Sequence, residues 1–149
     1  MNKIFNTPFE ISLRALLALS CCETAKSAYE IAIIDFIAVY GKTFGISEIN
    51  LHGDNDFMYS ELPARRTNTI QSIKVLALNG LIDIVYSNNE LLYQINESGS
   101  SYIQSFKCEY SKEYLALTER ALGYIGTKTM RKIIAEIDRK AITALRIGG

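Results

Sequence analysis

The segment "LHGDNDFMYSELPARR", residues 51–66, concentrates the side chains of this chain that could do chemistry. It contains the single histidine of the chain, three carboxylates and an arginine pair: His52, Asp54, Asp56, Glu61, Arg65 and Arg66. An imidazole beside carboxylates can ligate a cation or act as a general base. The alternative is an acidic linker that leads into a helix, and the rest of the chain has to decide between them.

A metal site in this segment is not supported by its spacing. Zinc sites use histidine and cysteine pairs at short intervals, and a calcium loop needs acids at alternate positions, then a glycine and a terminal glutamate. Neither pattern is present in residues 51–66. We therefore predict no metal and no cofactor, and we expect the carboxylates to pair with Arg65, Arg66 or a partner.

Catalysis is not supported either. A histidine beside acids becomes a catalytic base only when a nucleophile lies within hydrogen-bond reach, and no nucleophile motif or glycine-rich phosphate loop accompanies it. Cys21 and Cys22 lie in an apolar stretch, which is typical of core residues rather than reactive thiols. We predict that the chain is not an enzyme, has no catalytic residue and takes no small-molecule substrate.

Length and composition indicate one globular domain over residues 1–149, with 48% hydrophobic and 21% charged residues. Three cysteines do not make a disulfide framework. No run of 18 apolar residues exists, and Glu10 and Arg14 interrupt the apolar N-terminal stretch, so we expect a helix there rather than a signal peptide. These features favour the cytoplasm and no membrane partner.

The charge is balanced overall but unevenly distributed. Sixteen basic residues match sixteen acidic ones, whereas a protein that binds DNA through its phosphates carries a basic excess. Residues 128–149 contain six basic and two acidic residues, a net charge of +4, so residues 1–127 carry −4. This division suggests complementary partner surfaces or head-to-tail self-contact.

The apolar periodicity predicts mostly helices. A first helix begins at Pro8 with Thr7 as its N-cap, and further helices are expected over about 27–40, 63–79, 102–124 and 128–145. Two strand-like runs, 81–86 and 91–96, are joined by "SNNE", a hairpin signal. Three helices, a two-stranded wing and then more helix predict a mainly α fold. It has a winged helix-turn-helix core over about 5–106 and a helical extension over about 107–147.

DNA binding by the third helix is the alternative function from the residues alone. Suitable side chains for phosphates and base edges are Arg65, Arg66, Asn68, Gln71 and Lys74. However, the wing tip "SNNE" has no lysine or arginine, and the acids that precede the helix would repel phosphate. The last helix combines an apolar stripe with basic flanks, so we expect it to dock on a partner or on its own domain rather than on a membrane.

Four segments in this order resemble a known family: "FNTPFEISLRALLALS", "DFIAVYGKTFGISEINLHGDN", "ELPARR" and "LALNGLIDI…YQINESG". They are similar to the middle components of bacterial three-component ABC-ATPase systems, of which Lamassu-type anti-phage and anti-plasmid defence is the best-known example. The resemblance runs from about Ile4 to Phe106 and weakens in the C-terminal helices.

This resemblance implies a small non-enzymatic adaptor. Its partners would be an SMC-like ATPase, with Rad50-like heads and coiled coils, and an effector, often a nuclease. By analogy to the winged-helix and kleisin-like subunits of SMC complexes, the adaptor would bridge the ATPase heads and hold the effector inactive. DNA would be sensed by the ATPase, so that contact of the adaptor with DNA is mainly indirect.

For this role, we interpret residues 51–66 as an ordered docking loop rather than a catalytic centre. We predict one partner contact from Asp54, Asp56 and Glu61 together with the arginine pair, and we expect His52 either to orient the loop or to meet the partner. A second contact is predicted from the N-terminal helix, through Phe5, Phe9 and Arg14. Alternatively, Arg65 and Arg66 touch DNA that the ATPase holds.

Overall fold

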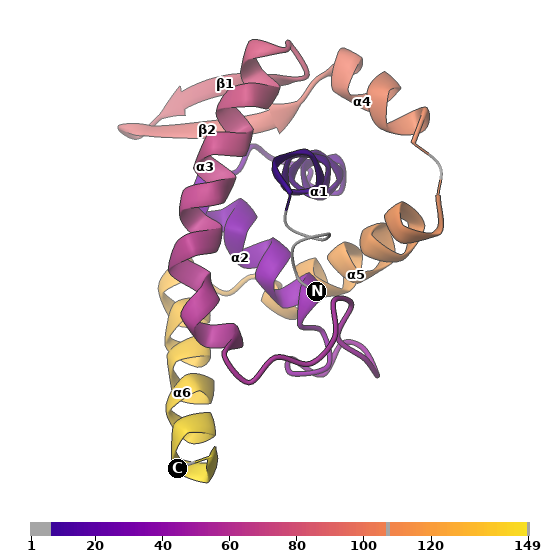
Figure 1. Cartoon of the computed structure of the whole chain (residues 1–149). Coiled ribbons are helices and arrows are strands. Elements are labelled where there is room, and N and C mark those ends of the chain that lie inside the picture. Colours follow the sequence, from indigo (N-terminus) through magenta and orange to yellow (C-terminus); the bar gives the residue numbers. More distant parts are fainter. Residues whose placement is uncertain (1–6, 107, 149) are drawn as a thin grey trace.

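The computed structural model describes residues 7–106 and 108–148, and it is mainly helical with one two-stranded antiparallel sheet (Figure 1). Its elements are α1 (Pro8–Ser20), α2 (Ala28–Val39), the 3-10 turn η2 (Met58–Glu61), α3 (Leu62–Leu78), β1 (Ile82–Ser87), β2 (Glu90–Ile95), α4 (Glu97–Gln104), α5 (Glu109–Ile125) and α6 (Met130–Gly148). Three long helices are followed by a wing and by further helices, which confirms the predicted fold class.

The first two helices begin at capping residues that the sequence marks. The Thr7 hydroxyl accepts a hydrogen bond from the Glu10 amide at 3.2 Å, with Pro8 in the first turn of α1. At α2, Ser27 and Glu30 form a reciprocal capping box, with distances of 3.1 and 2.9 Å. These bonds satisfy amides that would otherwise lack a partner at each helix start, and they fix where each helix begins.

Helix α2 lies at the centre of the molecule. Every residue from 31 to 39 is buried, because this helix is apolar on all sides and packs against α1, α3 and α5. One hydrophobic cluster joins α2 to α5 and α6, and a second joins α1 to α3 and β1. Helix α1 contributes to both clusters, so it links the wing half of the fold to the C-terminal half.

The wing is a tight hairpin. β1 pairs with β2 antiparallel, from Ile82 opposite Ile95 to Ser87 opposite Glu90. Asn88 and Asn89 form the two-residue turn with φ angles of 51° and 62°, the left-handed conformation that asparagine tolerates better than most residues. The hairpin predicted from "SNNE" is therefore confirmed. A bridge between Lys26 and Tyr93 also ties β2 to the connection between α1 and α2.

The prediction of one continuous helix from Tyr102 to Tyr124 is wrong. The structure has two helices there, α4 and α5, because polar side chains cap both sides of the break. The Ser105 hydroxyl donates to the Tyr102 carbonyl at 2.6 Å, and the Ser111 hydroxyl accepts from the Cys108 amide at 3.2 Å. The break lets α5 turn back and pack on α2 and α1.

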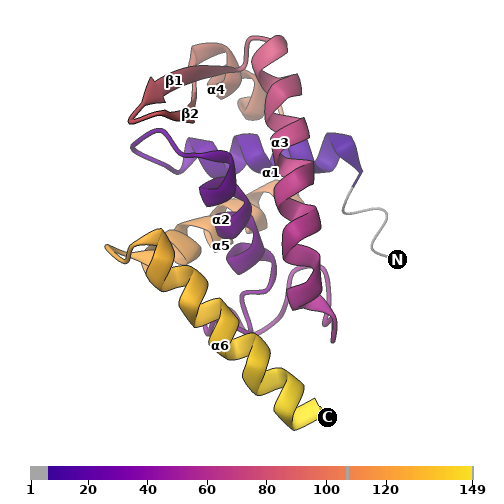
Figure 2. The ribbon, with the colours of Figure 1, turned by 90° about the vertical axis from the view of Figure 1, so that its left-hand side faces the viewer.

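The last helix is only half covered by the body of the protein. Ile133 and Ile137 are 1% and 4% exposed, whereas Leu145 is 75% exposed. Figure 2 shows the C-terminal half of α6 running away from the other helices. Among the residues that the structure describes, none of the helices is long and apolar enough to cross a membrane.

Gly99 offers a test of how closely α4 packs on the wing. A Cβ atom at this position would lie 2.8 Å from Ile95 Cγ1 and in direct conflict with the Leu81 carbonyl oxygen. Because that oxygen belongs to the backbone, we expect Gly99→Ala to lower the free energy of unfolding by about 2 kcal/mol or more. Urea denaturation followed by circular dichroism measures this change.

Gly123, in α5, is the matched control, because a Cβ there would meet nothing within 4 Å. Gly123→Ala is expected to stabilise the fold by up to about 1 kcal/mol through helix propensity. Equal effects of the two substitutions would contradict the close contact of α4 with the wing.

Candidate interaction surfaces

Four helices meet at one buried carboxylate. Asp35 Oδ1, on α2, accepts hydrogen bonds from Arg14 Nε of α1 at 2.9 Å and from the Tyr114 hydroxyl of α5 at 2.7 Å. Asp35 Oδ2 accepts from Arg65 Nη1 of α3 at 2.7 Å. The carboxylate thus joins α1, α3 and α5 to the central helix through charge-assisted hydrogen bonds.

The protonation states of this cluster follow from its surroundings. Burial by itself raises the pKa of Asp35, but Arg14 and Arg65 outweigh it and, with the Tyr114 hydrogen bond, lower that pKa to about 2. Burial and the Asp35 charge raise the pKa of Tyr114 well above its usual value. Asp35 is therefore ionised and Tyr114 is a neutral donor near neutral pH.

Burial gives Arg14 and Arg65 a structural role. They are 2% and 8% exposed, although the sequence favoured partner contacts for both and a DNA contact for Arg65. Both side chains reach inward to Asp35, at distances of 2.9 and 2.7 Å. The contacts that the structure shows for these two guanidinium groups are therefore internal, and the predicted partner and DNA contacts stay predictions.

The connection between α2 and α3, residues 41–61, is an ordered loop. The Asn50 carboxamide accepts from the Lys42 amide at 3.1 Å and donates to Asp54 at 2.9 Å. The Leu51 amide donates to the Val39 carbonyl at 2.9 Å, which fastens the loop to the end of α2. Gly53 has a φ of 89°, a conformation that other residues adopt only with strain.

The acidic residues of the loop fall into two groups. Asp54 and Asp56 are exposed, so they remain available to a partner. Glu61 turns inward instead: it accepts from the Tyr40 hydroxyl at 2.9 Å, is bonded by the Asn55 carboxamide, and lies 3.4 Å from Arg65 Nη2. Glu61 therefore extends the Asp35 cluster towards the loop rather than presenting a docking charge.

His52 anchors the loop to α5. Its Nε2 atom lies 2.6 Å from the Tyr110 hydroxyl, and the two rings stack with an interplanar angle of 16°. Burial, together with the nearby Arg14 charge, lowers the pKa of His52 to about 4, and burial raises the pKa of Tyr110 to about 12. Both groups are neutral near pH 7, so the contact is an anchor between uncharged rings.

Residues that could hold a metal ion are not assembled in the described part of the chain. There, no group of three or more His, Cys, Asp or Glu side chains converges on a point that could hold a metal ion. Burial raises the pKa of Cys21 to about 12 and also raises that of Cys22, whose thiol donates to the Ala18 carbonyl. Thiols with raised pKa values are poor nucleophiles near neutral pH.

The outer face of α3 is mixed in chemistry. The polar residues predicted to contact DNA are exposed, apart from Arg65: Arg66, Asn68, Gln71 and Lys74. Arg66 lies over the Tyr29 ring at 4.4 Å, so its guanidinium is partly held by a cation–π contact. Val75 and Leu78 are also exposed on this helix, at 49% and 87%. A row of polar groups that ends in large apolar side chains is more typical of a surface that binds another protein than of one that binds the phosphate backbone of DNA.

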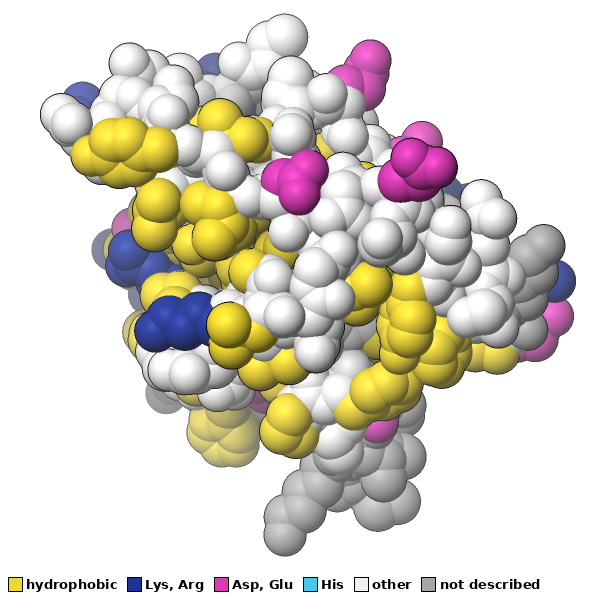
Figure 3. All heavy atoms as spheres, turned by 90° about the horizontal axis from the view of Figure 1, so that it is seen from above, with side chains coloured by type: hydrophobic (Ala, Val, Ile, Leu, Met, Phe, Trp, Pro, Cys, Tyr) yellow, Lys and Arg dark blue, Asp and Glu magenta, His cyan; other side chains and the backbone are white. Residues whose placement is uncertain are grey.

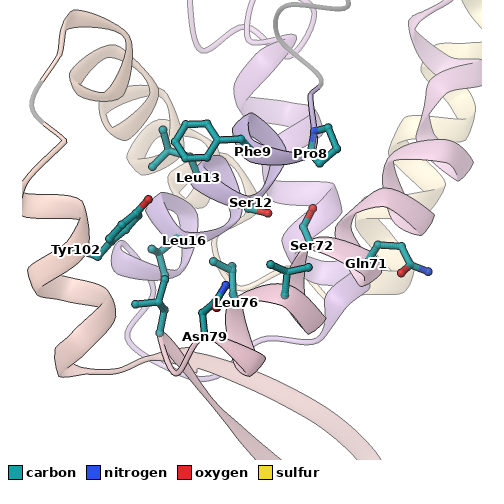
Figure 4. Close-up of a pocket in the computed structure, with 12 residues that line it drawn as sticks. Pro8, Phe9, Ser12, Leu13, Leu16, Gln71, Ser72, Leu76, Asn79 and Tyr102 are labelled. Atoms are coloured by element: carbon teal, nitrogen blue, oxygen red, sulfur yellow. The ribbon is translucent and has the colours of Figure 1, made fainter.

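An apolar groove lies between α1, α3 and α4 (Figure 4). It encloses about 260 Å³, and it is lined by Phe9 and Leu13 of α1, Val75 of α3 and Tyr102 of α4, among other residues. Phe9 is 53% exposed and its ring packs on Phe106 at 5.7 Å. Phe9 thus lies at a surface, and its partner contact stays a prediction, whereas Phe5 lies outside the described residues. We call this feature the α1–α3 groove.

The sequence reasoning missed the rest of this apolar surface. Val75 and Leu78 lie off the buried face of α3, and apolar residues at those positions were the sequence signal for an exposed apolar surface. On the wing, Ile84, Tyr86 and Leu91 are 54%, 67% and 50% exposed. Because strand residues alternate and Tyr86 pairs with Leu91, these three side chains share one face of the hairpin, here called the wing face. Hydrophobic side chains gather over this end of the molecule in Figure 3.

Comparison with known proteins identifies a family. A family model described as "ABC-three component (ABC-3C) system Middle Component 2" matches residues 4–146. The match continues through α5 and α6, well beyond the segment in which the sequence motifs are most evident. Neither a curated protein nor a solved structure matches the chain.

The Asp35 cluster predicts a large loss of stability when its charge is removed. Asp35→Asn keeps the shape of the side chain but leaves two buried guanidinium groups without their carboxylate. We expect the free energy of unfolding to fall by about 3–5 kcal/mol in a chemical denaturation experiment. The exposed Asp138, on α6, is the control, and Asp138→Asn should change it by less than about 0.5 kcal/mol. Similarly small changes in the free energy of unfolding for both variants would refute the structural role of Asp35.

His52 predicts a specific dependence of stability on pH. Its pKa is about 4 in the folded protein against 6.5 for the free side chain, so the unfolded chain binds the proton first as the pH falls. Folding therefore loses stability from pH 6.5 downward. Allowing for the partial exposure of the ring, we expect the wild type to lose about 1 kcal/mol more than His52→Gln between pH 7 and pH 5. Parallel stability curves for the two proteins would contradict the lowered pKa.

Proposed function

This chain belongs to the Middle Component 2 family of ABC-three component (ABC-3C) systems, and we propose that it is a non-enzymatic adaptor within such a system. A middle component of a multi-component system has protein partners. In the proposed assembly, one partner is an SMC-like ATPase with Rad50-like heads and the other is an effector, for which a nuclease is the best candidate.

The proposed role is to bridge the ATPase and the effector and to keep the effector inactive. DNA that the ATPase senses would then release or activate the effector, as in Lamassu-type anti-phage and anti-plasmid defence. The chain itself would perform no chemistry, and its contribution would be geometric. It would hold the ATPase and the effector in a fixed relative orientation until the ATPase changes its conformational state.

The observation that supports this proposal most is the apolar surface on the wing half of the fold. The α1–α3 groove, Leu78 and the wing face expose large hydrophobic side chains on elements fixed by the core. Exposed apolar patches on an otherwise well-packed protein mark interaction sites. Their position on helices and a paired hairpin suits a partner that is held in one orientation.

The charges of the wing turn and of the loop before α3 support indirect rather than direct contact with DNA. The wing turn is built from Asn88 and Asn89 and is followed by Glu90, so it offers no cation to a phosphate. Asp54 and Asp56 are exposed on the loop before α3. Binding to DNA through phosphates needs a basic footprint, and the chain as a whole has a net charge of zero.

A pull-down from cells that carry the native gene neighbourhood tests the proposal. The tagged chain is expected to recover an SMC-like ATPase and an effector in fixed ratio. Leu78→Glu should reduce recovery of at least one of them about tenfold, because it places a charge in the apolar surface. Ala116→Glu, on the exposed side of α5, is the matched control and should recover both. Thermal unfolding of each variant verifies that the fold is retained.

Two further measurements complete this test. Nuclease activity of the recovered complex on a reporter substrate should be low until the DNA that the ATPase senses is added. The same activity should rise when the adaptor is removed. Recovery of a homodimer that carries DNA and no other protein would reject the adaptor and favour an autonomous winged-helix regulator. Binding of that dimer to DNA would then weaken steeply with salt.

A further inference from the structure

The outer edge of the wing has free backbone groups. Tyr93 exchanges two backbone hydrogen bonds with Lys26, at 2.7 and 2.9 Å, so its amide and carbonyl point away from β1. Residues directly opposite each other in an antiparallel pair either bond to each other or both point outward, and Tyr93 lies opposite Ile84. The amide and carbonyl of Ile84 therefore point away from β2, and those of Tyr86, two residues on, do the same. No other backbone group of the described residues bonds to these groups, which we call the β1 edge.

The β1 edge is accessible. Both ribbon views show β1 on the side of the hairpin away from α1 and α2, and the tip of the hairpin projects away from α3 (Figures 1 and 2). The side chains of Ile84 and Tyr86 are 54% and 67% exposed. The usual means of blocking an edge are absent from this strand, because β1 contains no proline, lysine or arginine and its register with β2 has no bulge. An uncovered edge of this kind is a template for one more strand.

The sequence of β1 is complementary to a second copy of itself. In an antiparallel pair centred on Val85, Ile84 lies opposite Tyr86 of the second copy, and Tyr86 lies opposite Ile84 of the second copy. Each of these pairs exchanges both of its backbone hydrogen bonds, so the outward-pointing groups of both residues are satisfied. The side-chain pairs are isoleucine with tyrosine and valine with valine, which are the β-branched and aromatic combinations that stabilise sheets.

The charges of the strand favour the same register. A pair centred on Val85 places Asp83 opposite Ser87 of the second copy, whose hydroxyl is a donor for the carboxylate. The two Asp83 carboxylates then lie four residue positions apart along the strands, about 13 Å, where their repulsion is largely screened at physiological salt. A pair centred on Ile84 would instead place Asp83 opposite a valine. It would also need the backbone of Ile82, a residue only 4% exposed at the base of the strand.

We infer that two copies of this chain pair through their β1 edges, so that the two wings form one continuous antiparallel sheet in the order β2–β1–β1–β2. The contact is isologous and closes about a two-fold axis, which gives a dimer rather than open chains. It uses the rim of the sheet, and the α1–α3 groove of each copy remains available to other proteins. This inference goes beyond the proposed adaptor function, and it would give the adaptor two equal surfaces for its partners.

Sedimentation equilibrium of the purified full chain and of two proline variants tests the inference. Tyr86→Pro removes an amide that points outward from β1, and Leu91→Pro, the control, removes the amide directly opposite, which points outward from β2. Proline is tolerated in an edge strand where the amide faces solvent, so both hairpins should fold, which circular dichroism verifies. We expect the wild type to form a dimer. Tyr86→Pro should raise its dissociation constant about tenfold or more, and Leu91→Pro should change it less than about threefold.

Disulfide trapping gives an independent readout of the register. In a Cys108→Ser background, which removes the exposed native thiol, Val85→Cys places two thiols directly opposite each other. The Cα atoms of such a non-hydrogen-bonded pair are about 4.5 Å apart, within the range of a disulfide. Leu92→Cys is the control, because Leu92 lies opposite Val85 on β2 and is also half-buried, but would lie about 14 Å from its copy in the dimer. Mild oxidation should link most of the Val85→Cys protein and little of the Leu92→Cys protein.

The failures of the two proposals can be distinguished. A wild type that stays monomeric at every concentration overturns the pairing of β1 edges, as does a dimer that Tyr86→Pro does not weaken or that Val85→Cys does not link. Protection of the Tyr86 amide from hydrogen exchange only after another component is added also overturns it, because that component then supplies the strand. In each of these cases the pull-down decides the adaptor proposal separately. A dimer that recovers DNA and no other protein rejects the adaptor and leaves the pairing in place.

Discussion

The carboxylate of Asp35 is the interaction on which the arrangement of this protein depends. Two arginines and a tyrosine from three different helices donate to its two oxygens, at 2.7 to 2.9 Å. A charge buried in the central helix is costly unless these partners are in place, so the cluster favours the arrangement of α1, α3 and α5 that brings all three donors to Asp35. Hydrophobic burial supplies most of the stability, and the carboxylate selects the orientation.

The same cluster determines where the loop between α2 and α3 lies. Arg65 also contacts Glu61 at 3.4 Å, and Glu61 accepts from Tyr40, so the end of the loop is bonded to the core. His52 fastens the middle of the loop to Tyr110 on α5. Three of the six side chains in this segment that could do chemistry, His52, Glu61 and Arg65, are therefore used to hold the loop. The groups that remain exposed, above all Asp54, Asp56 and Phe57, stand on a fixed support.

Local patterns in the sequence predicted most of the helices and the hairpin. They did not predict contacts between residues that are far apart in the chain. The cap at Thr7, the hairpin and the amphipathic last helix all follow from residues close together in the chain. Arg14 and Arg65 are separated from Asp35 by 21 and 30 residues, and nothing near either arginine indicates its partner. The one signal was Asp35 itself, a single acid inside the apolar run "IAIIDFIAV". The break between α4 and α5 is marked by serine bonds between residues only three apart, so its signal was local and the sequence prediction overlooked it.

The half-covered α6 shows why this fold is better understood as part of an assembly. Isolated helices of this length are marginal in water, and packing of an apolar face supplies most of their stability. In α6 that packing ends after Ile137, yet the apolar face continues to Leu145 beside a groove of about 880 Å³. The exposed half gains nothing from its apolar residues while they face water, and a partner that covered them would add to its stability. The family match extends to residue 146 and so includes this half, which places the uncovered stripe within the unit that defines the middle component.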